Sequence, residues 1–297
     1  MNENLNKDEE LTVVFSGSYE DTEEIKNLTI PSGIVEIAEN AFRDFEHLET
    51  VKLPASLKKI SACAFSGCKG LKKVEFSYGI EEILDEAFSS CPALTEIIIP
   101  DSAKRIGEGC FEGCASLTRV KLSERIEMIG SCAFAYCFNL TEMTIPDSCV
   151  LVEFNAFYNC FSLEGIKLSE NMRLIDESTF EGCRSLKIDD LPARLVKIGR
   201  RAFKGCSSLI SIILPVGTLS IGFDAFSGCS LLGRIAIPKE LTEFEDDEVF
   251  GGCDNLNSIS YGGSREEWER LMRGKTLTLQ KSNCSVLTPT VSFMNLK

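Results

Sequence analysis

The sequence predicts an α/β solenoid, in which short strands form a parallel sheet on one face and short helices cover the other. Two observations carry this prediction. Phenylalanine recurs every 23 residues from Phe42 to Phe226, and a tenth copy, Phe250, follows after 24 residues. Leucine stands six positions after each of these phenylalanines, from Leu48 to Leu256. A unit of 23 residues is too short to bury its own apolar side, so successive units must stack and share one core.

Each unit opens with a half-buried strand. In the segment 48–54, Val51 and Leu53 alternate with the polar Thr50 and Lys52, so the apolar pair faces inward. Pro54 ends this strand, and most other units also have proline or serine at the same position. The chain is therefore expected to turn at this point in every coil.

A second extended segment and a short helix complete the unit. In the first full coil, Leu57 and Ile60 face inward in the second segment. Around Phe111, Gly107 is suited to cap a helix start and Gly113 to end it in the left-handed region, which predicts about two helical turns. One coil should therefore run strand, turn, strand, short helix and loop.

These columns resemble the leucine-rich repeats, and specifically the BspA-type subfamily, over residues 25–262. The resemblance implies a right-handed leucine-rich-repeat superhelix. We expect three parts: an N-terminal tail and edge-strand cap at 1–24, a solenoid of about ten coils at 25–262, and a C-terminal helical cap and tail at 263–297. Asparagine, familiar at one turn position of leucine-rich repeats, occurs there only at Asn171, so no asparagine ladder is expected.

Both ends of the solenoid carry residues suited to cover an open core. The segment Leu11–Phe15 reads as an edge strand. Near the other end, Ser264 and Glu267 form a capping box that opens a helix, and Gly274 is its expected stop. Trp268 lies on the apolar face of this helix and is expected to plug the last coil.

The composition argues against several classes of function. The formal net charge of −14 disfavours nucleic acid as a partner. His47 is the only histidine, so triads and multi-histidine metal sites lack their central residue. The acidic run at 243–248 lacks the ligand spacing of a calcium loop. No stretch is long enough to span a membrane, and the N-terminus does not read as a signal peptide. No catalytic residue, cofactor or metal site is predicted.

Cysteine is abundant, and most of the cysteines fall in one regularly spaced column of the repeat. Nine of the ten copies carry a cysteine three positions after the phenylalanine, from Cys68 to Cys253, whereas the first copy has Phe45 there. A regular column of this kind reads as a set of small buried hydrophobes. We expect free thiols in this column, which suits a reducing or anaerobic setting.

Aromatic residues break the repeat in the fifth and sixth coils. Phe138 and Phe161 occupy a column that other coils fill with Lys69, Ala115 or Ser207, and two tyrosines stand close to them in the sequence. Such a group could form an interaction hot spot on the loop side, or its rings could stack and seal the loops. We call this group the aromatic cluster, and its members are Tyr136, Phe138, Tyr158 and Phe161.

A second break lies on the outward face of the strands. Most outward positions are polar, with Ile98 as an isolated exception, but apolar residues gather there toward the C-terminus. Asp189 lies in an inward column, where a local distortion or an unusual polar contact is expected. The apolar group could dock a partner, pack against the coil of Asp189, or consist of scattered single residues. Its members are Ile188, Ile210, Ile213, Val216 and Ala236.

Taken together, the sequence predicts a non-catalytic protein-interaction scaffold. The resemblance implies a cell-surface or secreted bacterial-type adhesion protein, whose partner would be a host or surface protein or a glycan, and we expect a monomer without a membrane span. The alternatives are an intracellular binding protein or a structural spacer, and a hydrolase is disfavoured. The sequence alone does not fix the location.

Overall fold

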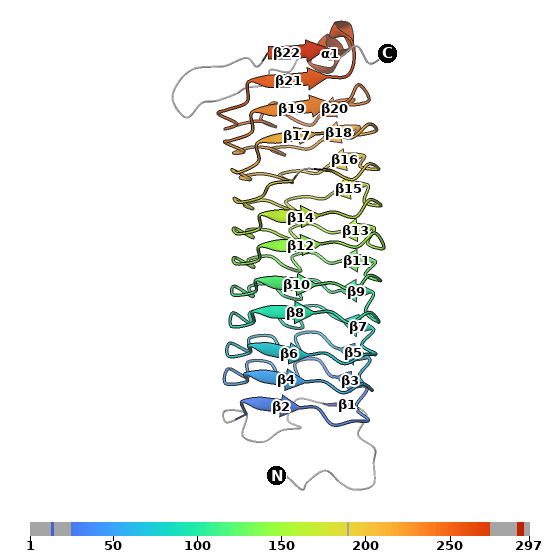
Figure 1. Cartoon of the computed structure of the whole chain (residues 1–297), viewed down its shortest axis with the longest axis vertical. Helices are drawn as coiled ribbons and strands as arrows, with labels where there is room; N and C mark the ends of the chain where they lie inside the picture. The colour runs from blue at the N-terminus through green and yellow to red at the C-terminus, as the bar shows by residue number, and fades with distance from the viewer. Residues whose placement is uncertain (1–12, 15–24, 189, 274–289, 294–297) are drawn as a thin grey trace.

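The protein is an elongated solenoid of stacked coils (Figure 1). The computed structural model describes residues 13–14, 25–188, 190–273 and 290–293. Most coils contribute one strand to each of two rows of parallel strands, and every strand of the described residues pairs with its counterpart in a neighbouring coil. In the first row, for example, Thr50 and Val51 lie opposite Lys73 and Val74, which follow them by 23 residues.

The strand bounds repeat with the sequence period. The first row contains β2 (Asn27–Thr29), β4 (Thr50–Lys52), β6 (Lys73–Glu75), β8 (Glu96–Ile98), β10 (Arg119–Lys121), β12 (Glu142–Thr144), β14 (Gly165–Lys167), β17 (Ser211–Ile213), β19 (Arg234–Ile237), β21 (Ser258–Tyr261) and β22 (Thr290–Phe293). The second row contains β1 (Val13–Val14), β3 (Glu36–Ile37), β5 (Lys59–Ile60), β7 (Glu82–Ile83), β9 (Arg105–Ile106), β11 (Met128–Ile129), β13 (Leu151–Val152), β15 (Leu174–Ile175), β16 (Lys197–Ile198), β18 (Ser220–Ile221) and β20 (Glu243–Phe244).

The expected helices around the phenylalanines are wrong. In the described residues these segments are turns. The residues two before and two after the phenylalanine have positive φ in coil after coil, as at Cys63 (54°) and Gly67 (75°). Because a left-handed residue cannot continue a right-handed helix, the N–H groups bond to the next coil instead. The N–H of Phe42, for example, donates to the carbonyl of Ala64 at 2.8 Å.

The phenylalanines form one continuous stack inside the solenoid. From Phe42 to Phe250, neighbouring rings lie 5.1 to 5.8 Å apart and within 19° of parallel. All of these rings are fully buried. Aromatic contacts of this kind add to the free energy gained from burying apolar area, so the stack joins each coil to the next.

The cysteine column lies beside this stack and is buried as predicted. Each thiol donates to the carbonyl of the phenylalanine one coil earlier, at 3.1 to 3.3 Å, from Cys68 on Phe42 to Cys253 on Phe226. Cysteine therefore combines a small apolar volume with a donor for a buried main-chain oxygen.

The rows of strands are interrupted at particular coils. The first row divides into the sheets β2-β4-β6, β8-β10-β12-β14 and β17-β19-β21-β22, and the second into a seven-stranded sheet that ends at β13 and a four-stranded one that begins at β15. Between β14 and β17, the described residues form no strand in the first row. This is the coil in which the sequence predicts a distortion, but Asp189 itself lies outside the described residues.

Ile188 belongs to this interrupted coil, and its predicted exposure is wrong. Its side chain is only 6% exposed and belongs to the hydrophobic core. In the sequence register, the buried Ile166 and Ile212 of the neighbouring coils correspond to position 189, one residue after Ile188. Since the sequence places an acidic residue in the inward column of this coil, burying the adjacent isoleucine fills the core at a lower cost than burying an unpaired carboxylate.

Described residues at both ends of the solenoid lie in the segments that the sequence predicts as caps. Strand β1 pairs with β3 at the N-terminal end. At the other end, α1 (Arg265–Leu271) begins with the predicted capping box, in which the N–H of Glu267 donates to Ser264 Oγ and the N–H of Ser264 donates to the Glu267 carboxylate. Trp268 is buried against Tyr261, with ring centres 5.2 Å apart. The predicted helix stop, Gly274, lies outside the described residues.

Candidate functional site

An apolar surface occupies the C-terminal part of the first row of strands. Its members surround β17 and β19, where Ile213 lies opposite Ala236 in the strand register. The three large side chains are 61%, 69% and 72% exposed, and Ala236 is half-buried. Four of the five predicted residues therefore come together at the surface. We call them the C-terminal sheet patch: Ile210, Ile213, Val216 and Ala236.

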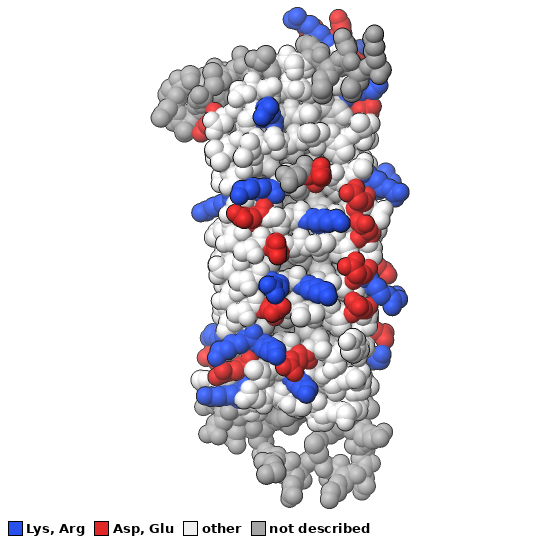
Figure 2. Space-filling model, viewed as in Figure 1, with Lys and Arg blue, Asp and Glu red and all other residues white. Residues whose placement is uncertain are grey.

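Charge is sparse around this patch. Ser211, Ser258 and Ser260 fill outward positions of the fully described strands β17 and β21, and Arg234 on β19 is the one charged residue at the outward positions of these three strands. Figure 2 shows few charged side chains over β17, β19 and β21, in contrast to the strands nearer the N-terminus. There four of the seven positions equivalent to Ile213 carry charges, namely Lys52, Glu75, Lys121 and Lys167.

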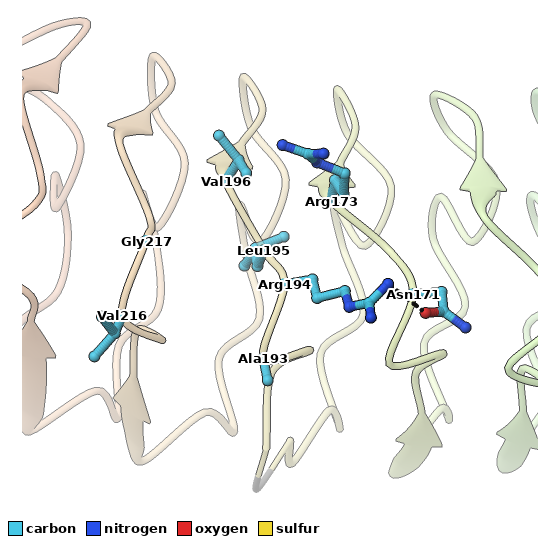
Figure 3. A pocket seen from close by; sticks show the side chains of 8 residues that line it. All are labelled: Asn171, Arg173, Ala193, Arg194, Leu195, Val196, Val216 and Gly217. Atoms are coloured by element: carbon cyan, nitrogen blue, oxygen red, sulfur yellow. Dashed lines mark hydrogen bonds between the residues drawn. The ribbon is translucent and has the colours of Figure 1, made fainter.

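A shallow hollow of about 400 Å³ adjoins the patch at the turns between the two rows of strands (Figure 3). Val216 contributes to both features, and Val196 and Leu195 line the hollow beside it. Arg194 points across the opening and donates to the Asn171 side chain at 3.1 Å. An apolar floor beside an anchored guanidinium suits a protein side chain with an apolar body and a polar end.

The coil that carries most of the patch also exposes apolar side chains outside the patch. Sequence reasoning missed three large apolar residues here: Leu219 at 43%, Phe223 at 40% and Leu231 at 49% exposure. The signal was present in the sequence, because this coil places apolar residues at several positions outside the repeating columns.

The aromatic cluster also forms, as the sequence predicts. Phe138 and Phe161 stack face to face with ring centres 5.0 Å apart, and Tyr136 meets both Phe138 and Tyr158 edge-on at 6.1 and 5.4 Å. The guanidinium of Arg184 covers the outer face of Phe161 at 4.5 Å. The rings thus contact one another and a cation of the same chain, which favours a role in sealing the loops.

The described thiols are poorly suited to nucleophilic chemistry. Burial raises the pKa of both Cys114 and Cys160 to about 12, so these groups stay protonated at neutral pH. Burial also raises the pKa of the half-buried Cys63 and Cys132. His47 is exposed on the loop of the first coil, the coil that lacks a column cysteine.

Neither a cluster of metal-ligating side chains nor a membrane-spanning helix is found in the described residues. Within that part of the chain, no group of three or more histidine, cysteine, aspartate or glutamate side chains could hold a metal ion. No helix in the same residues combines the length and apolar character that crossing a bilayer requires.

Coils stacked at a 23-residue period, with parallel strands and an internal phenylalanine ladder, define a leucine-rich-repeat solenoid. The model of the BspA type leucine rich repeat region, with six copies, matches residues 2–114, 36–164 and 150–272. The chain belongs to this BspA-type leucine-rich repeat family. Proteins with such repeats typically act as protein-interaction scaffolds and not as catalysts.

Several solved structures are similar to this chain, and the first of those that follow supports the fold. The pneumococcal vaccine antigen PcpA is similar with a TM-score of 0.58 and 23% identity, over 86% of this chain and 75% of that one. A leucine rich cell surface protein from Faecalibacterium prausnitzii has 27% identity and a TM-score of 0.49, over 86% and 83%. A leucine-rich repeat protein from T. pallidum has 24% identity and a TM-score of 0.46, over 70% and 78%. No curated protein sequence matches the chain significantly.

Proposed function

We propose that this protein is a non-catalytic scaffold whose protein partner docks on the C-terminal sheet patch. The observation that carries the proposal is the change along one outward column, from charged residues near the N-terminus to the exposed Ile213 and the half-buried Ala236. Contiguous exposed apolar surface with little charge is typical of interaction sites, whereas isolated apolar residues are not.

The patch offers apolar surface that can contribute to the free energy of binding. Burying one large aliphatic side chain contributes about 1.5–3 kcal/mol when it moves from full exposure to full burial. Ile210, Ile213 and Val216 are roughly two-thirds exposed, so together they could supply about 3–6 kcal/mol. Truncating or charging one of them should then weaken binding by tenfold or more.

Family membership supports further parts of the proposal. We place the protein at the cell surface or in the secreted fraction of a bacterial-type cell, where its binding serves adhesion to a host or surface protein, and we propose that it acts as a monomer. The right-handed winding of the coils is proposed on the same ground. An intracellular binding protein would use the same patch, whereas a spacer would bind nothing there.

A positive charge introduced into the patch tests it. Immobilised wild-type chain, Ile213→Lys and Val150→Lys are exposed to extracts of host cells and of the source cells, and proteins captured in different amounts are identified by mass spectrometry. Val150 is an apt control because its side chain is 61% exposed and lies outside the patch and both hollows. We expect a partner that Val150→Lys retains and Ile213→Lys loses. Equal capture by both variants, at unchanged melting temperature, would contradict the proposed site.

A further inference from the structure

The first row of strands opens between β6 and β8 (Figure 1). One coil earlier, the N–H of Leu53 donates to the carbonyl of Glu75 at 3.0 Å, and one coil later the N–H of Ile99 donates to Lys121 at 2.9 Å. Phe76 occupies the equivalent position, and among the described residues no backbone bond joins its strand to β8. Main-chain donors and acceptors that other coils use for the sheet are therefore open here.

A large side chain explains the opening. Phe76 stands in the column that Leu53 and Ile99 fill in the adjacent coils. Its ring is half-buried and meets Phe88 edge-on, with ring centres 5.9 Å apart and planes at 69°. The second row is continuous at this level, since β5, β7 and β9 remain paired, so the coils separate only on the side of the first row.

The opening leaves a surface hollow of about 590 Å³, a size common for small-ligand sites. Its apolar lining comes from Phe76, Tyr78, Ile98 and Pro100. Tyr78 is 87% exposed, which makes it the most exposed of the large hydrophobic side chains in the described residues. A flat ring of this kind offers an apolar face beside a polar hydroxyl.

The charges at the hollow neutralise one another. Lys73 pairs with Glu75 at 2.6 Å, and Lys72 pairs with Glu49 at 2.7 Å. Glu96 lies 3.8 Å from a guanidinium nitrogen of the next coil. An ionised ligand would have to compete with these pairs, whereas a neutral ligand with hydroxyl groups can both donate to the carboxylates and accept from the ammonium groups.

We propose that this hollow binds a neutral saccharide residue. One face of the sugar ring packs on Tyr78, and its hydroxyls bond to Thr95, to the paired charges and to the open main-chain groups of β6 and β8. A peptide strand inserted between β6 and β8 is disfavoured, because it would hold these two strands about 9.6 Å apart, whereas Cα atoms of β6 and β8 lie within 8 Å of one another. This site is separate from the C-terminal sheet patch and does not depend on the function proposed for it.

A glycan array provides the probe. Fluorescently labelled full-length chain is applied to neutral oligosaccharides of glucose, galactose, mannose and N-acetylglucosamine, with sialylated and sulfated glycans alongside. We expect binding to neutral glycans, with no preference for the acidic ones. Tyr78→Ala should weaken this binding about tenfold, because the stacking face is lost. Tyr158→Ala, which removes a tyrosine of the aromatic cluster, should leave it unchanged.

A second variant tests the opening itself. Phe76→Leu restores the side chain of the column, so it should close the hollow, slow hydrogen exchange of the residue 76 amide and weaken glycan binding while Tyr78 stays in place. Binding that survives both Tyr78→Ala and Phe76→Leu would overturn the proposal. Preference for sulfated or sialylated glycans, or no binding to any neutral glycan on the array, would overturn it as well.

Discussion

Replacing two column cysteines by alanine should make the free energy of unfolding fall less steeply as the pH rises from 7 to 10. Burial raises the pKa of Cys114 and Cys160 from an ordinary value of 9.0 to about 12. The folded chain therefore holds these protons where the unfolded chain releases them. The stability that they contribute is fully present below pH 9 and is lost as the pH rises toward 12. At pH 10 the loss is about 1.4 kcal/mol for each thiol, or nearly 3 kcal/mol for the pair.

The measurement is the free energy of unfolding by urea at pH 7 and at pH 10. The doubly substituted chain, Cys114→Ala with Cys160→Ala, starts from a lower stability at pH 7 because it carries two small cavities. Its further loss between pH 7 and pH 10 should be about 3 kcal/mol smaller than that of the wild type. Cys63→Ala is the control, since Cys63 is half-buried and its removal should change the loss less. An identical pH dependence in all three chains would refute the protonated thiol column.

Three further predictions follow from local geometry. Gly107→Ala should cost roughly 2 kcal/mol or more, because its Cβ would lie 2.4 Å from a backbone carbon, whereas Gly165→Ala meets nothing within 4 Å and should be neutral in thermal melting. Phe138→Ser with Phe161→Ser should lower stability by about 1–3 kcal/mol and leave partner binding intact; lost binding at unchanged melting would instead make the cluster the docking site. Ser264→Ala should cost about 1 kcal/mol, visible as faster hydrogen exchange in α1, and unchanged exchange would count against the capping box.

The sequence predicts the coils well because the core repeats in one dimension. Each inward residue, such as Leu48 or Ile60, meets its own counterpart one coil away, so a column of like residues specifies both the strand and its register. The prediction of helices around the phenylalanines was wrong for a different reason. Glycine after the phenylalanine, as at Gly67, reads as a helix stop, but Cys63 and Glu86 also adopt positive φ without any glycine signal. The hydrogen bonds between coils that stabilise these residues cannot be predicted from the sequence of a single unit.

The candidate surfaces, too, were predictable from the sequence only where the coil is regular. The exposed positions of Ile213 and Val216 follow from strand alternation and turn position, which hold wherever the coil is regular. Ile188 could not be placed in this way, because its coil departs from the regular strand pattern. The hollow beside Tyr78 arises from one large column residue, Phe76. Its effect on strand pairing depends on packing between coils and could not be predicted from the sequence.

The most direct test of the central claim is hydrogen exchange of the chain with and without its captured protein partner. If the partner docks on the C-terminal sheet patch, exchange should slow along β17 and β19 and at the turn of Val216, with little change in β4, β10 or the loops of Phe138 and Phe161. Protection confined to those loops, or no protection in β17 and β19 at saturating partner, would contradict the account.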